Sequence, residues 1–435
     1  MQLVKLNGSN KKLKWTAEDM SNAIVIYSAG PRAYRLLLKR GYPYPAVSTI
    51  KSWLAKIKIS PGIIKNIFNI ISHTEMTPLQ KVCVIAFDEM KIRSVYEYDR
   101  VTDTTMKPSN YVQIVLLRGL FENWKQPIFF EYDFQMTTEK FFEIILFVEQ
   151  LGFQVVACVS DLGGGNRGFF RGLNVTPEQP FFINPANKEK VFVIADVPHL
   201  IKLIRNHFVD KDATCSSDLR MTYKITKETL NVTGPGRQKV KLATKLFSNT
   251  ISAAIIRSGT LDDLQCDFWF ECAEFFKLVN DWFDVLNSRT LVSDTRDRLK
   301  PYGLKLESQN HILDSMTATI KNMRVIGRTT LLPFQKGVIM TNTSVQLLFK
   351  DLQRRFSTKY ILTYRLNQDV IKNFFGVIRA NGGLHDHPSA LEVKYRIRKY
   401  IFGRNEGSLS SMGNTEDDQT PSLPTESNLT GHLFL

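Results

Sequence analysis

The hydrophobic pattern of this chain alternates between strand-like runs and amphipathic helices. Residues 81–87, KVCVIAF, form a near-continuous apolar run, which is typical of a central strand. Residues 137–153, TTEKFFEIILFVEQLGF, place apolar side chains at helical spacing and predict an amphipathic helix. Further strands are expected at 109–121, 126–134, 154–161 and 190–196. Because strands and helices are interspersed, we expect a mixed α/β fold.

Residues 15–66 have a purely helical pattern. Helices are predicted at 15–27, 31–40 and 46–58, and Pro31 is well placed to begin the second. Three short helices in this order indicate a helix-turn-helix module. In the third helix the apolar residues form an inner face, and the outward side chains suit phosphates and base edges. These outward residues are Ser48, Thr49, Lys51, Ser52, Lys56 and Lys58. The alternative is a small helical bundle whose lysines only keep it soluble.

The charge of the chain favours a DNA-binding helix-turn-helix over a small helical bundle. The chain has a formal net charge of +15 and a pI near 9.4. Residues 1–60 carry eleven Lys and Arg against two Asp and Glu. Because neutralising phosphates releases counterions, this basic region favours a polyanionic partner such as DNA.

Other features of the composition indicate an intracellular protein. No apolar run approaches the roughly 20 residues that cross a bilayer, and residues 1–15 lack the apolar stretch of a secretory signal, so no membrane partner is expected. The cysteines are widely scattered, without the paired spacings of a zinc site, and are expected to be reduced thiols. They are Cys83, Cys158, Cys215, Cys266 and Cys272.

Two aspartates close predicted buried strands. Asp88 follows residues 81–87, and Asp161 ends residues 154–161 just before the glycine-rich LGGGNRGFF. Carboxylates placed in this way can meet at one edge of a sheet and share divalent metals, the chemistry of phosphoryl transfer, provided that a third carboxylate is present. The alternative is that each aspartate only caps a turn. A third strand ends at Asp196, and the helix after it carries His199, Lys202 and Arg205.

Long, ordered motifs connect the chain to a known family. They include FDEM, SDLGGGNRGFF, IADVPHLIKLIRNHFVD, KVKLATKLFSNT, FFKLVNDWFDVLNS, LPFQKG and residues 360–401, which begin YILTYRLNQDVIKNFF. Together they closely resemble P-element transposase, from about Trp15 to Gly403. The resemblance implies a nuclear cut-and-paste DNA transposase with a ribonuclease H-like fold, interrupted by a mainly helical GTP-binding insertion.

The composition, the helical pattern and the resemblance together predict a domain order. It comprises a basic leader (1–14), the helix-turn-helix (15–66), the first part of the ribonuclease H-like fold (78–210), the insertion (211–333), the last part of that fold (334–404) and a disordered acidic tail (405–435).

Site residues follow from the resemblance as well. It implies that Asp88 and Asp161 bind the family's Mg²⁺ or Mn²⁺ ions. It implies a guanine nucleotide site in the insertion, with lysines for phosphates, an aromatic face for the base and a carboxylate for the guanine donors. The matching residues are Asp218, Lys224, Lys239, Val240, Ser248, Phe283 and Asp284. No Walker-type GxxxxGK[ST] sequence is present, so the nucleotide site rests on the resemblance alone.

The sequence departs from the family pattern at several places. No zinc-coordinating THAP module and no leucine-zipper heptads precede residue 15, the segment between Phe208 and Asp218 is shorter than in the family, and the C-terminal region stops early. The family's third catalytic carboxylate lies in the pattern Q-D-x-x-E-x-F-F, and here QDVIKNFF places Lys372 at that position. An ammonium cannot ligate a cation and repels it. Asp369 lies three residues earlier on nearly the same helix face and is the candidate substitute.

Three functions remain open for this chain, and they differ in the role that Lys372 and its surroundings play. The first is a transposase-like DNA-binding protein, degenerate or domesticated, with impaired strand cleavage, in which Lys372 pairs with Asp88 or Asp161 or lies outward in solvent. The second is an active GTP- and metal-dependent transposase that uses Asp369. The third is a truncated, repressor-like protein that forms mixed oligomers with intact transposase or occupies DNA. A homo-oligomer is also expected.

Overall fold

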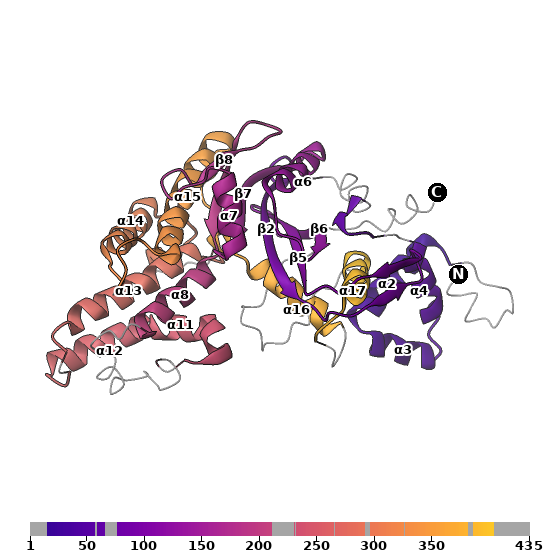
Figure 1. Cartoon of the computed structure of the whole chain (residues 1–435), viewed down its shortest axis with the longest axis horizontal. Coiled ribbons are helices and arrows are strands. Elements are labelled where there is room, and N and C mark those ends of the chain that lie inside the picture. Colours follow the sequence, from indigo (N-terminus) through magenta and orange to yellow (C-terminus); the bar gives the residue numbers. More distant parts are fainter. Residues whose placement is uncertain are drawn as a thin grey trace.

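The structure is a computed structural model that describes residues 15–56, 59–65, 76–210, 230, 232–264, 266–291, 296–325, 327–381 and 386–403. Figure 1 shows a central sheet with a helical region on one side and the N-terminal helices on the other. The prediction of a mixed α/β fold is confirmed. Among the described helices, none combines the length and apolar character that crossing a bilayer requires.

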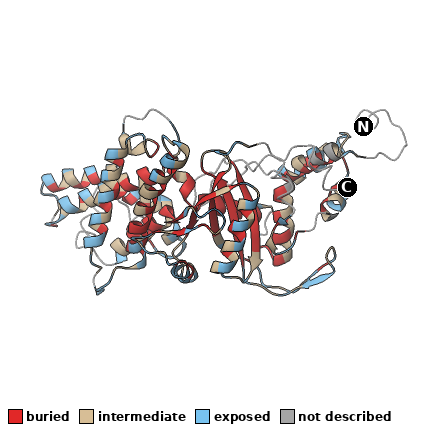
Figure 2. Ribbon diagram, turned by 90° about the horizontal axis from the view of Figure 1, so that it is seen from above, coloured by how far each residue is buried: buried red, intermediate tan, exposed pale blue. Residues whose placement is uncertain are grey.

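The central sheet has seven strands in the order β1-β6-β5-β2-β7-β9-β8. The strands β2, β5 and β6 form an antiparallel meander, and β7 and β9 then join β2 in parallel. Figure 2 shows that these strands are almost wholly buried, as their apolar runs require. The strand bounds are β1 Gly62–Ile63, β2 Val82–Lys91, β5 Tyr111–Gly119, β6 Lys125–Tyr132, β7 Gln154–Ser160, β8 Phe181–Ile183 and β9 Lys190–Ala195. A separate two-stranded hairpin, β3 (Glu97–Asp99) and β4 (Thr104–Met106), lies between β2 and β5 in the chain.

Helices from the middle and the C-terminal part of the chain lie beside this sheet. The predicted amphipathic helix forms as α6 (Thr138–Gln150), whose residues Phe141, Ile144 and Ile145 are buried. Thr137 begins it by accepting from the Lys140 N–H at 3.2 Å. The others are α7 (Gly164–Gly172), α8 (Val197–Asp210), α15 (Pro333–Phe356), α16 (Asp369–Ala380) and α17 (Ala390–Gly403).

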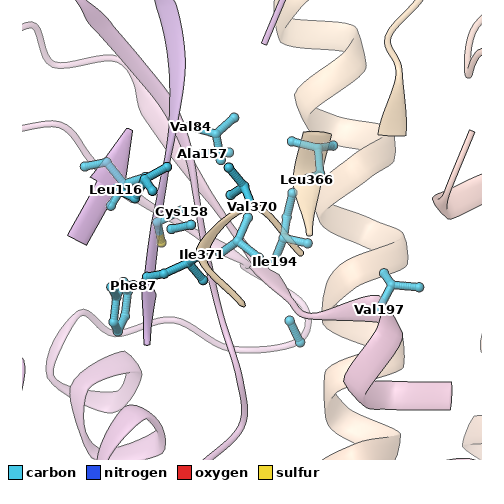
Figure 3. Close-up of a cluster of buried hydrophobic side chains, with 14 of the residues drawn as sticks. Val84, Phe87, Leu116, Ala157, Cys158, Ile194, Val197, Leu366, Val370 and Ile371 are labelled. Atoms are coloured by element: carbon cyan, nitrogen blue, oxygen red, sulfur yellow. The ribbon is translucent and has the colours of Figure 1, made fainter. Parts of the chain in front are cut away.

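The start of α16 is fixed by apolar contacts with the sheet. Val370 and Ile371 are fully buried, and Figure 3 shows them in one cluster with Cys158 of β7 and Ile194 of β9. Each fully buried aliphatic side chain contributes about 1.5–3 kcal/mol. This packing holds the polar residues on the same turn of α16 against the carboxyl ends of the parallel strands.

A helical region is inserted between α8 and α15. It is attached to the sheet layer through α13, whose Trp282 Nε1 donates to Asn342 Oδ1 of α15 at 2.7 Å. Its described elements are η1 (Gly234–Gln238), α11 (Val240–Leu246), α12 (Asn249–Thr260), α13 (Trp269–Leu286), η2 (Asp297–Leu299) and α14 (Leu306–Asn322), followed after α15 by η3 (Thr363–Leu366).

The three N-terminal helices form as α2 (Ala17–Ala29), α3 (Pro31–Lys39) and α4 (Val47–Lys56). Thr16 and Asp19 make the capping box that begins α2. The helix α2 packs against α17, so this unit contacts the C-terminal part of the chain. The helix-turn-helix function assigned to it stays a prediction.

One prediction about the cysteines is wrong. Cys266 is disulfide-bonded, whereas Cys83, Cys158 and Cys272 are free thiols as expected. Spacing along the sequence could not reveal this, because disulfide formation depends on the distance between side chains in the fold. Cys215, the leader (1–14) and the tail (405–435) lie outside the described residues.

Candidate active site

Three aspartates lie in one row across neighbouring parallel strands. Ala86 pairs with Val159, and Ser160 pairs with Ala195. Continuing this register places Asp88 of β2 beside Asp161 after β7, and Asp161 beside Asp196 after β9. The carboxylates predicted to meet at one sheet edge therefore do so, with Asp196 as a third member of the row.

Lys372 of α16 forms an ion pair with Asp196 Oδ2. The Asp196 side chain is completely buried, and the side chain of Lys372 is 23% exposed. The other oxygen of Asp196, Oδ1, accepts from the Gln368 N–H at 2.9 Å. The prediction that Lys372 pairs with Asp88 or Asp161 is wrong in its choice of partner, and the alternative of an outward, solvated lysine is excluded.

The signal for this partner was present in the sequence. Asp196 ends a buried strand in the same way as Asp88 and Asp161, and Lys372 falls on the first turn of α16. What the sequence did not give is the strand register, which places Asp196 under that turn. The side chain of Gln368 also reaches across the sheet, with Nε2 donating to the Phe87 carbonyl at 2.8 Å.

The electrostatics of the row reflect this arrangement. Burial raises the pKa of Asp88 to about 7, with a further rise from Asp161 and an opposing effect from Lys372. Burial alone would lower the pKa of Lys372, but Asp196, Asp88 and Asp369 raise it above its usual value. Lys372 is therefore a firmly charged ammonium among carboxylates.

Asp369 is held by an arginine. It accepts from Arg289 Nη2 at 3.3 Å and from Asn367 Nδ2 at 3.3 Å. Burial raises its pKa to about 6, with a further contribution from Asp196. An arginine partner and a reduced tendency to ionise both make Asp369 a poorer metal ligand than an open carboxylate.

Two further titratable side chains, Lys202 and His199, lie near the row of aspartates. Burial lowers the pKa of Lys202 on α8 to about 8, and the charge of Lys372 lowers it further. Burial also lowers the pKa of His199, and Lys202 and Lys372 add to this effect.

Asp161 accepts from the Gly163 N–H at 3.0 Å and from Asn166 Nδ2 at 2.7 Å, so it also shapes the glycine-rich loop before α7.

The donor set does not fit a two-metal centre. Mg²⁺ and Mn²⁺ prefer carboxylate oxygens, and a two-metal site needs several of them. Asp88 and Asp161 supply two carboxylates, but the third position holds the Lys372 ammonium, and both oxygens of Asp196 already accept hydrogen bonds. Within the described ranges, no group of three or more His, Cys, Asp or Glu side chains is arranged to hold a metal ion.

The predicted nucleotide residues lie on three helices of the insertion. Lys239 and Val240 begin α11, and Ser248 caps α12 by accepting from the Ile251 N–H at 3.3 Å. Phe283 and Asp284 lie on α13, next to each other in the chain. Asp218 and Lys224 lie outside the described residues.

Asp284 is engaged within the protein. Its Oδ2 accepts from Arg298 Nε at 2.9 Å and from Asn280 Nδ2 at 2.9 Å. Burial raises its pKa, and Arg298 opposes that rise. A guanine base would have to compete with Arg298 for this carboxylate.

The predicted DNA-contacting face of α4 is exposed as expected in its first turns. Ser48, Lys51 and Ser52 are exposed and Thr49 is half-buried. Ile50 and Leu54 are buried on the opposite face. The side chain of Lys56, and Lys58 as a whole, lie outside the described residues.

A mixed sheet that ends in a row of carboxylates, closed by a late helix and interrupted by a helical insertion, defines a ribonuclease H-like protein. Family models agree: residues 59–174 match the TNP-like, RNase H N-terminal domain, and residues 213–298 match the TNP-like, GTP-binding insertion domain.

Individual relatives narrow this class. The chain is 40% identical over 417 residues to the Transposable element P transposase of Drosophila melanogaster, covering 92% of this chain and 55% of that protein. It is 21% identical to the human DNA transposase THAP9, covering 89% of this chain and 49% of that protein. The chain thus spans about half the length of the curated relatives it matches. The solved Drosophila P element transposase strand transfer complex superposes with a TM-score of 0.88 at 39% identity, covering 94% of this chain and 96% of that one. The chain belongs to the P-element transposase family.

Proposed function

We propose that this chain is a DNA-binding protein of the cut-and-paste transposition class whose ribonuclease H-like centre is impaired in strand cleavage. The observation that carries the proposal is the ion pair between Lys372 and Asp196. It puts a fixed positive charge, within the protein, where the family's third carboxylate would supply a negative one.

The charge of Lys372 opposes metal binding in two ways. It removes a ligand, and it repels a divalent cation that approaches Asp88 and Asp161. Losing several kcal/mol of transition-state stabilisation lowers a rate by several orders of magnitude, because each 1.4 kcal/mol is about tenfold. The contact of Asp369 with Arg289 argues against its use as a replacement ligand.

The family's other properties complete the proposal. GTP binds the insertion, the face of α4 binds duplex DNA, and the protein acts in the nucleus as a homo-oligomer or together with intact transposase. The match of residues 213–298 to a GTP-binding insertion model and the exposed Lys51 support the first two of these.

The test is cleavage of pre-nicked family transposon ends in Mg²⁺ or Mn²⁺. The unmodified chain is expected to be inactive, and Lys372→Glu is expected to recover metal-dependent cleavage. Lys372→Gln, which removes the charge without supplying a carboxylate, and Lys350→Glu, at an exposed position of α15, are the matched controls and should stay inactive. Metal-dependent cleavage by the unmodified chain that is lost in both Asp161→Asn and Asp369→Asn would refute the proposal and favour Asp369 as the third carboxylate.

A further inference from the structure

The β3–β4 hairpin has one face bound to the protein and one face turned away from it. Asp99, fully buried, accepts from Lys394 Nζ at 2.7 Å and from Tyr395 Oη at 2.6 Å, both on α17. Glu97 accepts from the Leu391 N–H at 3.3 Å. Because side chains alternate along a strand, the anchoring of residues 97 and 99 turns Tyr98 to the opposite face. Tyr96 and Arg100 lie just outside the strand and are also exposed.

The hairpin and the residue before it present two tyrosines to solvent. Tyr96 is 74% exposed, the most exposed of the large hydrophobic side chains that the structure describes, and Tyr98 is 54% exposed. The Tyr98 hydroxyl donates to Asp103 Oδ1 across the turn, which orients its ring. Arg100, in the turn after β3, is exposed. The buried anchor of Asp99 and the hydrogen bond of Tyr98 hold the hairpin in place, so Tyr98 loses little further freedom when a ligand binds.

Basic residues flank the tyrosines. Lys91, Arg93 and Lys107 at the base of the hairpin are exposed, and Arg93 lies 3.9 Å from Glu392 in a loose ion pair. With Arg100, residues 91–107 carry four cations against three acids. The acids are bonded within the protein, Asp103 to Tyr98 and both Glu97 and Asp99 to α17. The exposed part of the hairpin is therefore aromatic, and exposed cations stand near it in the chain.

The hairpin follows, in the chain, the strand that carries Asp88. The strand β2 carries Asp88 and ends three residues later at Lys91, and the chain then enters the hairpin. The hairpin thus leaves the sheet at the edge where Asp88 lies.

We propose that the Tyr96–Tyr98 face binds single-stranded DNA, with bases stacked on the two rings and the backbone held by the flanking cations. Exposed aromatic rings between cations are the recurring platform for unpaired bases, since every base has a face that can stack. A duplex hides these faces and would meet only the charges. The proposal rests on the DNA-binding function proposed above and assigns a second surface to it, separate from α4.

The test is fluorescence anisotropy of the full chain with a labelled mixed-sequence single strand and with its duplex. Tyr96→Ala is expected to raise the Kd for the single strand about tenfold, the effect of one lost stacking partner, and to leave the duplex Kd unchanged. Tyr96→Phe keeps the ring and is expected to bind like the unmodified chain. Phe268→Ala removes a ring of 62% exposure on the insertion and is the matched control, expected to have no effect. Arg100→Ala is expected to reduce the salt-dependence slope for the single strand by about 0.7.

A variant of α4 distinguishes DNA binding by the hairpin from DNA binding by α4. Lys51→Glu is expected to weaken duplex binding only. If Lys51→Glu leaves duplex binding intact while Tyr96→Ala weakens single-strand binding, the assignment of α4 fails and that of the hairpin holds. Equal single-strand affinity for Tyr96→Ala and the unmodified chain, or loss of duplex and single-strand binding alike, would overturn the hairpin proposal and leave the tyrosines as a contact for another protein.

Discussion

Replacing Lys372 by methionine tests the physical basis of the site without any assay of DNA cleavage. The substitution removes the ammonium but keeps an unbranched apolar side chain of similar length. Asp196 then keeps the Gln368 N–H at 2.9 Å but loses its counter-charge while completely buried. Breaking a buried ion pair from one side costs about 3–5 kcal/mol, and the partial exposure of Lys372 places this case near the lower end, at about 3 kcal/mol.

This free energy can be measured as a shift in melting temperature. For a unit of 150–250 residues, a loss of 1 kcal/mol lowers Tm by about 2–4 °C, so Lys372→Met should lower it by about 6–12 °C. Thermal unfolding of the full chain, followed by circular dichroism at neutral pH, gives the value. The double variant Lys372→Met with Asp196→Asn should recover part of the loss, because it leaves no unpaired charge.

The control is Lys350→Met, at an exposed position of α15, which should change stability by less than about 0.5 kcal/mol. If Lys372→Met shifts Tm no more than this control, the ion pair contributes nothing to folding. The reasoning that treats Asp196 as a buried charge in need of a partner would then be wrong.

Three further predictions follow from other parts of the molecule. Burial would raise the pKa of Asp99, but hydrogen bonds from Lys394 and Tyr395 lower it below its usual value. The stabilisation of the fold by ionised Asp99 is therefore complete above the unfolded pKa of about 3.9, and it is lost as the pH falls further. The Tm difference between the unmodified chain and Asp99→Asn should be large at pH 7 and should shrink below about pH 4, and a difference that is independent of pH would contradict this. Lys51→Glu should weaken duplex DNA binding and flatten its salt dependence in an anisotropy titration, whereas unchanged binding would mark α2–α4 as a protein-contact bundle. Calorimetry should show GTP bound in preference to ATP, and equal binding of both would remove guanine recognition from Asp284.

Periodicity predicted several strands and helices of the fold. The apolar run of β2, the amphipathic pattern of α6 and the proline that begins α3 each determine local structure through contacts close in the sequence. The order of the strands was beyond this reasoning, because it depends on which runs pair across long separations. The inserted helices were expected from the family resemblance rather than from the residues.

The sequence predicted which residues form the candidate site, but not which of them form the ion pair. Asp88, Asp161 and Lys372 were identified as one group, and the structure brings them to one edge of the sheet. The choice of Asp196 as the partner of Lys372 depends on a register and on a turn of α16, which no local pattern encodes. The contact between Asp369 and Arg289 was missed for the same reason, since 80 residues separate the two in sequence.

The way in which the insertion joins the sheet layer has a consequence for how its length can differ between related chains. His207, near the end of α8, stacks on Phe334, near the start of α15, with ring centroids 4.6 Å apart. The insertion therefore leaves and re-enters the sheet layer at neighbouring positions, and the stacked rings hold these two ends close together. Because closing a loop between fixed ends costs free energy that grows only slowly with its length, residues can be gained or lost between these positions with little effect on the sheet. The loops that connect the helices between α8 and α15 can therefore change length, whereas the row of aspartates in the sheet layer keeps its register.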